Sequence, residues 1–168
     1  MKKKSKNKIA IYISTYGKKI YKCGLKHGIP IEVGATQRNK NHECKYSVQD
    51  NYGENISTEN PYYGELTALY WIWKNVHTYK YVGTCHYRRY LLNEQEKIFT
   101  EAEYLELLKD YDLITTKRVV LNNSYHYGFA TNHNIHALDM TGEVIKELYP
   151  EYYDTFVQLV NGTETYFG

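Results

Sequence analysis

The chain has 168 residues, 42% hydrophobic and 24% charged, a composition typical of one soluble globular domain with its own core. Its net charge is +2, and its first eight residues include five lysines, so composition does not support a broad basic face for nucleic acid. No apolar run approaches the roughly 18 residues of a membrane span, and no signal-peptide core follows the basic start. We therefore expect a cytoplasmic protein, with a flexible basic tail at 1–8 and a single domain over 9–168.

The cysteines and tyrosines of the chain give two further indications. Cys23, Cys44 and Cys85 stand far apart without a CxxC pair, which predicts reduced thiols in a reducing compartment. Tyrosine occurs 20 times, and its flat ring with a hydroxyl at the edge suits sugars and nucleobases. The coding bias of an AT-rich genome would explain the same excess, so both interpretations stay open.

The first half of the chain predicts two strands and a long helix. The β-branched and aromatic runs at 8–14 and 29–33 predict buried strands. The polar stretch 37–52 predicts an irregular loop. An Asn-Pro pair then suits the cap and first turn of a helix that we expect over residues 60–77.

The second half alternates strands and helices in the same way. Residues 81–85 predict a third strand, and a capping-box pattern of Thr100 and Glu103 starts a helix that we expect to end near residue 109. Residues 112–116 predict a fourth strand. This alternation predicts an α/β domain with a mostly parallel central sheet flanked by helices. Three more helices are expected, over 132–139, from a Thr141 cap to Tyr149, and over 151–160.

The segment that follows the third predicted strand carries the strongest local signal for a binding site. In open α/β sheets, ligands bind beyond the carboxyl ends of the strands. Arg88 and Arg89 lie there and can bind phosphate through two-pronged hydrogen bonds, while His86 can donate a hydrogen bond or act as an acid or base near pH 7. An alternative also stays open, in which one arginine pairs with a carboxylate and the neighbouring tyrosines pack.

The predicted helix at 60–77 carries a candidate carboxylate and two tryptophans. Glu65 lies near its start, where a carboxylate stabilises the helix by interacting with the helix dipole. The alternative is a role in the site, in which Glu65 hydrogen-bonds a sugar hydroxyl or pairs with Arg88 or Arg89. Trp71 and Trp73 point to different faces of the helix, so one can lie in the core while the other lines a cleft. Of the two arrangements, we expect both tryptophans in the core.

The sequence carries no clear metal-binding motif. The histidines His126, His133 and His136 match no zinc signature. Asp110 and Asp112 formally match the DxD pattern that binds a divalent ion and a diphosphate. They lie where a helix runs into a strand, so we interpret Asp112 as a strand start. We expect no metal, with these two acids as the alternative ligands of Mn²⁺ or Mg²⁺.

Several runs taken together resemble one family. The sequence contains GENIS at 53–57, NPYYGELTALYWIWKN at 60–75 and HYRRY at 86–90, with IEVGA at 31–35 and YDLIT at 111–115. It is similar to a domain of unknown function common in bacterial capsular and exopolysaccharide gene clusters, whose hallmark runs are ELTxxYWxWKN and GxxHYRRY. The resemblance covers nearly the whole chain.

The resemblance implies a glycosyltransferase. The implied fold is the GT-A-like nucleotide-diphospho-sugar transferase fold, and the implied reaction transfers a hexose from a nucleotide-diphosphate sugar, first of all a UDP-sugar, to a glycan or lipid-linked acceptor. A peripheral association with the inner face of the membrane would fit this role. The family continues past residue 168, so we expect this chain to stop before its acceptor side is complete. The main alternative is a non-catalytic sugar-nucleotide or carbohydrate-binding module. RNA binding through the lysine tail and tyrosines is a second alternative.

The resemblance also implies site residues. Glu65, Thr67, His86, Arg88 and Arg89 occupy its motif positions, and we assign catalysis to all of these except Thr67, which we expect to bind substrate. The family usually carries a His-Lys pair after the first strand, where this chain has Tyr16 followed by glycine. Our hypothesis is that cationic side chains stabilise the leaving diphosphate in place of a metal. The other expected substrate contacts are Thr15, Tyr16, Gly34, Asn55, Ser57, Tyr87, Tyr90 and His133.

Overall fold

The structure is a computed structural model that describes residues 8–17, 28–41 and 43–165. The chain divides into two compact units, residues 1–114 and 115–168, which are considered separately below. Residues 1–7 of the predicted tail at 1–8, Cys23 and the end at 166–168 lie outside the described residues.

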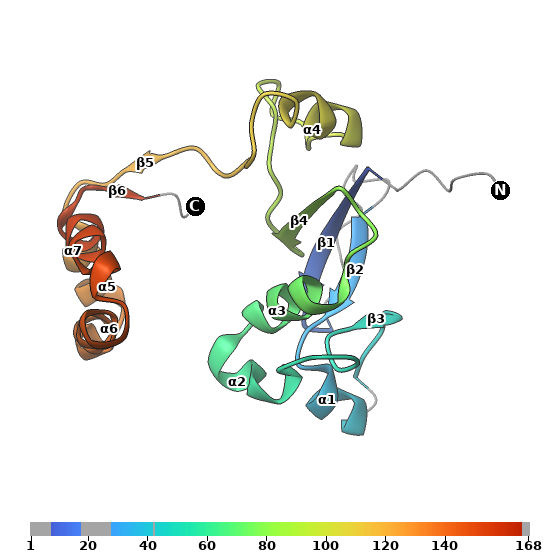
Figure 1. The fold of residues 1–168 in the computed structure, drawn as a ribbon, viewed down its shortest axis with the longest axis horizontal. Coiled ribbons are helices and arrows are strands. Elements are labelled where there is room, and N and C mark those ends of the chain that lie inside the picture. Colours follow the sequence, from blue (N-terminus) through green and yellow to red (C-terminus); the bar gives the residue numbers. More distant parts are fainter. Residues whose placement is uncertain (1–7, 18–27, 42, 166–168) are drawn as a thin grey trace. The chain divides into compact units, whose positions relative to one another are not determined.

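The first unit is built on a parallel sheet whose strands lie in the order β3-β2-β1-β4 (Figure 1). Its strands are β1 (Ile9–Thr15), β2 (Gly28–Glu32), β3 (Val48–Gln49) and β4 (Tyr81–His86). β1 lies between β2 and β4 and is buried along almost its whole length, which explains its continuous apolar run. The predicted α/β class with a parallel central sheet is confirmed.

Two details of the sheet differ from the prediction. The short strand β3 forms inside the stretch 37–52, which the sequence predicts as loop, because Val48 and Gln49 pair with the end of β2. Residues 112–116 form no strand, so the prediction of a fourth strand there, and of Asp112 as its start, is wrong. Leu113 is 79% exposed, and Ile114 is only partly buried, so among the described residues this run forms no ladder and is not buried in a core.

The predicted helix at 60–77 is two helices, α2 (Asn60–Tyr63) and α3 (Leu66–Asn75). Gly64 separates them with a φ of +54°, outside the helical region. α3 packs on the sheet through Ala68, Trp71 and Ile72. Trp73 is 66% exposed, so the expectation that both tryptophans lie in the core is wrong for Trp73.

Shorter helices complete the first unit. The short helices α1 (Ala35–Arg38), η1 (Asn39–Asn41) and η2 (Ser57–Glu59) lie in the segments that follow β2 and β3. α4 (Glu101–Leu107) begins with the predicted capping box, in which the Thr100 hydroxyl accepts from the Glu103 amide at 3.3 Å and the Glu103 carboxylate accepts from the Thr100 amide at 2.7 Å.

The second unit is mainly helical. A short antiparallel pair, β5 (Val119–Val120) and β6 (Glu164–Thr165), joins its two ends. Between them lie α5 (Tyr125–Asn132), α6 (Ile135–Leu148), η3 (Pro150–Tyr152) and α7 (Tyr153–Asn161). The last helix fits the expected 151–160. Among the described residues, no helix is long and apolar enough to cross a bilayer.

The two helices predicted at 132–139 and 141–149 are one helix, α6, and the preceding helix α5 was not predicted. Asn134 caps α6, because its side chain accepts from the His136 amide at 3.1 Å. Thr141 lies inside α6 and its hydroxyl donates to the Ala137 carbonyl at 2.7 Å, so the prediction that Thr141 caps a separate helix is wrong.

Candidate functional site

The candidate site of the first unit lies at the carboxyl ends of β1, β2 and β4. Ser14 is opposite His86 in the register of β1 and β4, and the Tyr87 amide donates to the Ser14 carbonyl at 3.1 Å. On the other side of β1, the Val33 amide donates to the Thr15 carbonyl at 3.0 Å. The sheet therefore brings the predicted segments around Thr15, Gly34 and His86 to one edge, where α/β folds bind ligands.

His86 lies beside Glu65. Its Nε2 is 3.8 Å from a carboxylate oxygen of Glu65, and the amide of Arg88 donates to its Nδ1 at 3.3 Å. In the neutral ring this leaves the proton on Nε2, facing the carboxylate. Burial lowers the pKa of His86; Glu65 opposes this shift, and Arg88 and Arg89 add to it. His86 is therefore mainly neutral near pH 7 and presents an N–H donor.

Arg88 and Arg89 are exposed on the turn that leaves β4. The Arg89 amide donates to the His86 carbonyl at 3.1 Å, and the Tyr90 hydroxyl donates to the Tyr87 carbonyl at 3.1 Å, which closes the turn. The Arg88 guanidinium lies over the Tyr87 ring at 5.1 Å. Within the described part of the chain, neither arginine forms an ion pair with a carboxylate, and Glu65 faces His86 instead. Both guanidinium groups are thus available to an anion.

The backbone segments around the candidate site, called the framework below, are joined by the buried carboxylate of Asp50, which the sequence analysis did not assign to the site. Asp50 accepts hydrogen bonds from the amides of Gly34 and Ala35 at 2.9 and 3.0 Å. It also accepts from the hydroxyls of Ser57 and Thr67, both at 2.6 Å. Asp50, Ser57 and Thr67 are almost completely buried, so these hydroxyls point into the framework. Asp50 thereby ties the end of β2, the turn at Ser57 and the start of α3 to one point.

Two more predicted contacts belong to this framework. Asn55 uses its amide locally, since its Nδ2 donates to the Gly53 carbonyl at 2.9 Å and its Oδ1 accepts from the Ser57 amide at 3.1 Å. Gly34 has a φ of +63°, and a Cβ there would lie 2.6 Å from the Asn60 side chain. Only glycine fits at this position.

Tyr16 rests on a buried ion pair that the sequence did not reveal. The Arg38 guanidinium lies over its ring at 4.5 Å and donates to the carboxylate of Glu32. Glu32 also accepts from the amides of Gly17 and Lys45 at 3.1 and 2.6 Å. Burial raises the pKa of Glu32, but the hydrogen bonds from Arg38, Lys45 and Gly17 outweigh it, and the pKa is lowered. The half-exposed Tyr16 ring is thus a fixed aromatic surface at the end of β1.

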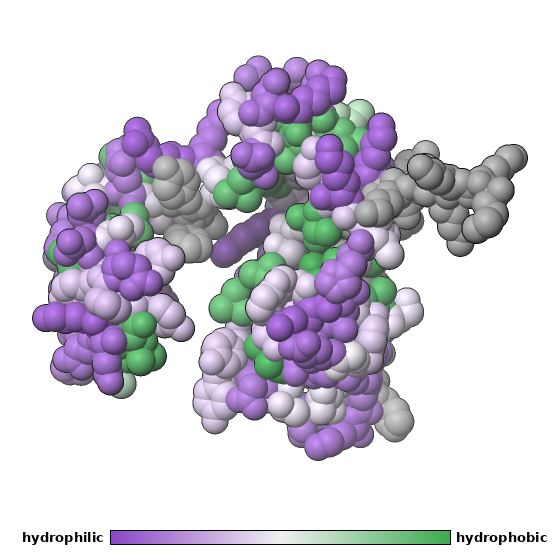
Figure 2. Space-filling view, in the orientation of Figure 1, coloured by the Kyte–Doolittle hydropathy of each residue, from purple (hydrophilic) through white to green (hydrophobic). Residues whose placement is uncertain are grey.

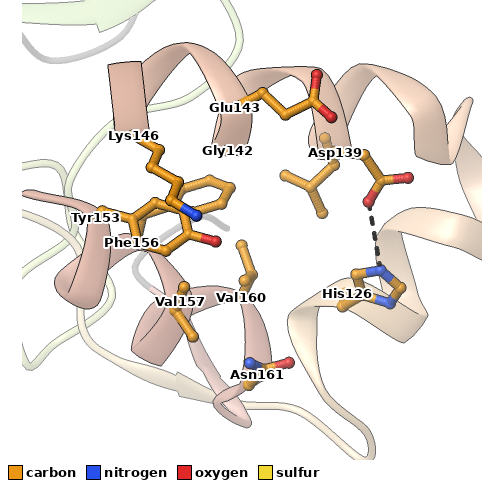
Figure 3. Close-up of a pocket in the computed structure, with 11 residues that line it drawn as sticks. His126, Asp139, Gly142, Glu143, Lys146, Tyr153, Phe156, Val157, Val160 and Asn161 are labelled. Carbon is orange, nitrogen blue, oxygen red and sulfur yellow. Dashed lines mark ion pairs between the residues drawn. The ribbon is translucent and has the colours of Figure 1, made fainter. Parts of the chain in front are cut away.

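The remaining candidates lie elsewhere. His133 is exposed at the end of α5 in the second unit, where its ring contacts Phe129 at 4.8 Å. His126 faces Asp139 at 3.9 Å beside a groove of about 500 Å³ between α6 and α7 (Figure 3). Asp110 and Asp112 are exposed after α4. The described residues include no group of three or more acidic, His or Cys side chains arranged to hold a metal.

Comparisons with known proteins place the chain in a family. A solved structure described as the apo structure of the bifunctional glycosyltransferase WbbM is similar, with a TM-score of 0.76 and 27% identity. The match covers 96% of this chain and 33% of that chain, so the present chain spans about a third of its length. No curated protein matches. A family described as a domain of unknown function, DUF4422, matches residues 10–168. The chain therefore belongs to the DUF4422 family.

Proposed function

We propose that this chain is a glycosyltransferase domain of the GT-A type, which transfers a hexose from a nucleotide-diphosphate sugar, first of all a UDP-sugar, to a glycan acceptor. The 27% identity with the similar glycosyltransferase structure supports the reaction class. The motif runs GENIS, ELTALYWIWKN and HYRRY support a role in capsule or exopolysaccharide synthesis, at the cytoplasmic face of the membrane.

The observation that carries the proposal is the cationic turn after β4. Arg88 and Arg89 are exposed there without a carboxylate partner among the described residues, and neutral His86 presents an N–H beside them. During transfer, the oxygen of an acceptor hydroxyl forms a bond to the sugar C1 and gives up its proton to a base or to solvent. The bond between C1 and the diphosphate oxygen breaks, and its electron pair stays on the diphosphate. Positive charges and N–H donors held at that position stabilise the developing charge.

Neighbouring groups supply the rest of the donor site. Tyr16, backed by Arg38, offers a ring for the base, and the Gly34 turn lies at the same edge. The Glu65 carboxylate lies 3.8 Å from the His86 Nε2. In this proposal it accepts a hydrogen bond from a sugar hydroxyl. In this proposal the two arginines take over the role that a divalent metal plays beside a DxD motif, so donor binding needs no Mn²⁺.

The proposal is tested by calorimetric titration of UDP-, GDP-, dTDP- and CMP-sugars, each with and without Mn²⁺. We expect one of the three nucleotide-diphosphate sugars to bind with the same affinity in both conditions, and the CMP-sugar, which carries a single phosphate, not to bind. Absence of binding by all four classes would contradict a donor site, and binding only with Mn²⁺ would shift the site to Asp110 and Asp112. An assay of nucleotide-diphosphate release with glycan acceptor then separates an enzyme from a binding module, which binds the donor without turnover.

A further inference from the structure

α3 carries a second apolar face, opposite to the one that packs on the sheet. The buried face uses Trp71 and Ile72, whereas Leu66, Leu69, Tyr70 and Trp73 follow the helical spacing on the outer side. A helix of a globular domain normally needs only one apolar stripe, because its other side meets water. Figure 2 shows hydrophobic (green) side chains at the surface near α3, next to the paler surface over α2.

The exposed area of this face is large for a monomer. Leu66, Leu69 and Trp73 are 53%, 49% and 66% exposed, and on α2 Tyr62 and Tyr63 are 85% and 53% exposed. At ~200 Å² for one large side chain, these five side chains expose about 600 Å². That area is at the upper end of the patches on ordinary monomers, and it approaches the ~800 Å² that each partner contributes to a standard interface.

The side chains at the centre of this face contact one another in the single chain. The rings of Tyr70 and Trp73 meet edge to face at 5.7 Å. The Lys74 ammonium lies over the Trp73 ring at 4.0 Å and pairs with Glu54 at 2.9 Å, while the Tyr70 hydroxyl donates to Glu54 at 3.0 Å. Ordered aromatic side chains lose little conformational entropy on binding, which is typical of the residues that dominate protein interfaces.

We propose that this outer face of α2 and α3 is a homodimer interface, in which α3 packs antiparallel against α3 of a second copy. The stripe from Leu66 to Trp73 is about 10 Å long, so one helix of the same length covers it. A two-fold axis between Leu69 and Tyr70 brings Leu66 of each copy against Trp73 of the other, so a short side chain meets a long one in both halves. The two leucines favour this partner over a glycan, because they offer no hydrogen bonds to hydroxyl groups.

The test is sedimentation equilibrium of the full chain between about 1 and 100 µM. We expect the wild type to approach twice the 19.9 kDa of one chain. Leu69→Glu places two carboxylates, one from each copy, next to the two-fold axis of the dimer. Because these like charges would be buried together, the change should raise the dissociation constant at least ~10-fold. Leu113→Glu is the matched control, since Leu113 is an exposed leucine of the same unit that belongs to neither α2 nor α3, and it should leave association unchanged.

A second variant keeps the test valid if Leu69→Glu does not fold. With Cys23, Cys44 and Cys85 replaced by serine, Leu69→Cys should form a disulfide-linked dimer under oxidation, and Leu113→Cys should not. A wild type that stays at 19.9 kDa throughout, or equal effects of the changes at Leu69 and Leu113, would overturn the proposal. A monomer that binds anionic lipid vesicles or polysaccharide through Leu69 would also overturn it, and would identify that ligand as the occupant.

Discussion

His86 is held neutral by its surroundings, and this decides what it can offer a ligand. Burial lowers its pKa, and the nearby guanidinium groups of Arg88 and Arg89 act in the same direction against the opposing effect of Glu65. A bound diphosphate would reverse this balance, because it brings negative charge next to the ring. Anion binding at this turn is therefore coupled to protonation of His86.

The first prediction concerns this coupling. In the free protein His86 is mainly neutral at pH 6.5 and above, since its pKa is lowered from that value. The affinity for a UDP-sugar, whose diphosphate does not titrate in this range, should therefore rise as the pH falls below 6.5. His86→Gln should remove the rise, and His77→Gln, a change at an exposed histidine of the same unit, should keep it. Calorimetry at several pH values measures this, and a wild-type affinity independent of pH would contradict the coupling.

The sequence predicts some residues of the site better than others. Arg88 and Arg89 follow a recognisable strand, so their position at the edge of the sheet could be predicted. The partner of Glu65 could not, because the break at Gly64 decides where the start of α3 points. Asp50 carries no periodic signal in its polar stretch, and its role depends on amides and hydroxyls up to 17 residues away.

At the scale of elements, Asp50 connects three segments that are far apart in the sequence. The end of β2, the turn at Ser57 and α3 meet at its carboxylate, and none of these hydrogen bonds lies within one helix or strand. The start of α3 also carries Glu65, so the same carboxylate helps to hold Glu65 beside His86. Asp50 thus acts on the site through positioning.

The second prediction follows from these four hydrogen bonds. Asp50→Ala leaves two amides and two hydroxyls buried without this acceptor, at about 1–3 kcal/mol for each unsatisfied group, so we expect a loss of at least about 3 kcal/mol in the free energy of unfolding. Asp112→Ala removes an exposed carboxylate and should change it by less than about 0.5 kcal/mol. Urea unfolding measures both, and similar values for the two variants would show that Asp50 is not the connecting group.

Element boundaries depart from the sequence prediction where tertiary contacts decide. The pattern from 60 to 77 is helical throughout, yet Gly64 divides it. The apolar run at 112–116 has strand composition but pairs with no strand among the described residues. Conversely, Thr141 resembles a helix start but lies inside α6, because Asn134 already caps that helix. Local patterns give the type of most elements, and packing sets their ends.

At the scale of the whole molecule, the two units differ in how much core they have. The first unit buries apolar side chains from β1, β2 and α3 in one cluster. In the second unit, α5 and α7 bury no residue completely, and α6 buries only Leu138 and Gly142 among the described residues. Gly142 allows the Phe156 ring to approach the helix backbone, since a Cβ there would lie 2.9 Å from the ring.

The third prediction is that the two units differ in local stability. With few buried apolar side chains, the second unit should open at a lower free energy than the first. Amides of α6 and α7 should therefore exchange with deuterium much faster than those of β1 and β4. Hydrogen exchange read by mass spectrometry or NMR measures this. Protection of α6 equal to that of β1 would show that the second unit gains stability from contacts beyond its own core.

The central claim is that Arg88 and Arg89 bind the diphosphate of the donor. The most direct measurement is calorimetric titration of UDP into the variant Arg88→Ala with Arg89→Ala, compared with wild type and with Lys97→Ala plus Lys109→Ala, which removes the same charge elsewhere in the first unit. We expect wild type and the lysine variant to bind alike and the arginine variant to lose measurable binding. Unchanged affinity in a folded arginine variant would contradict the account.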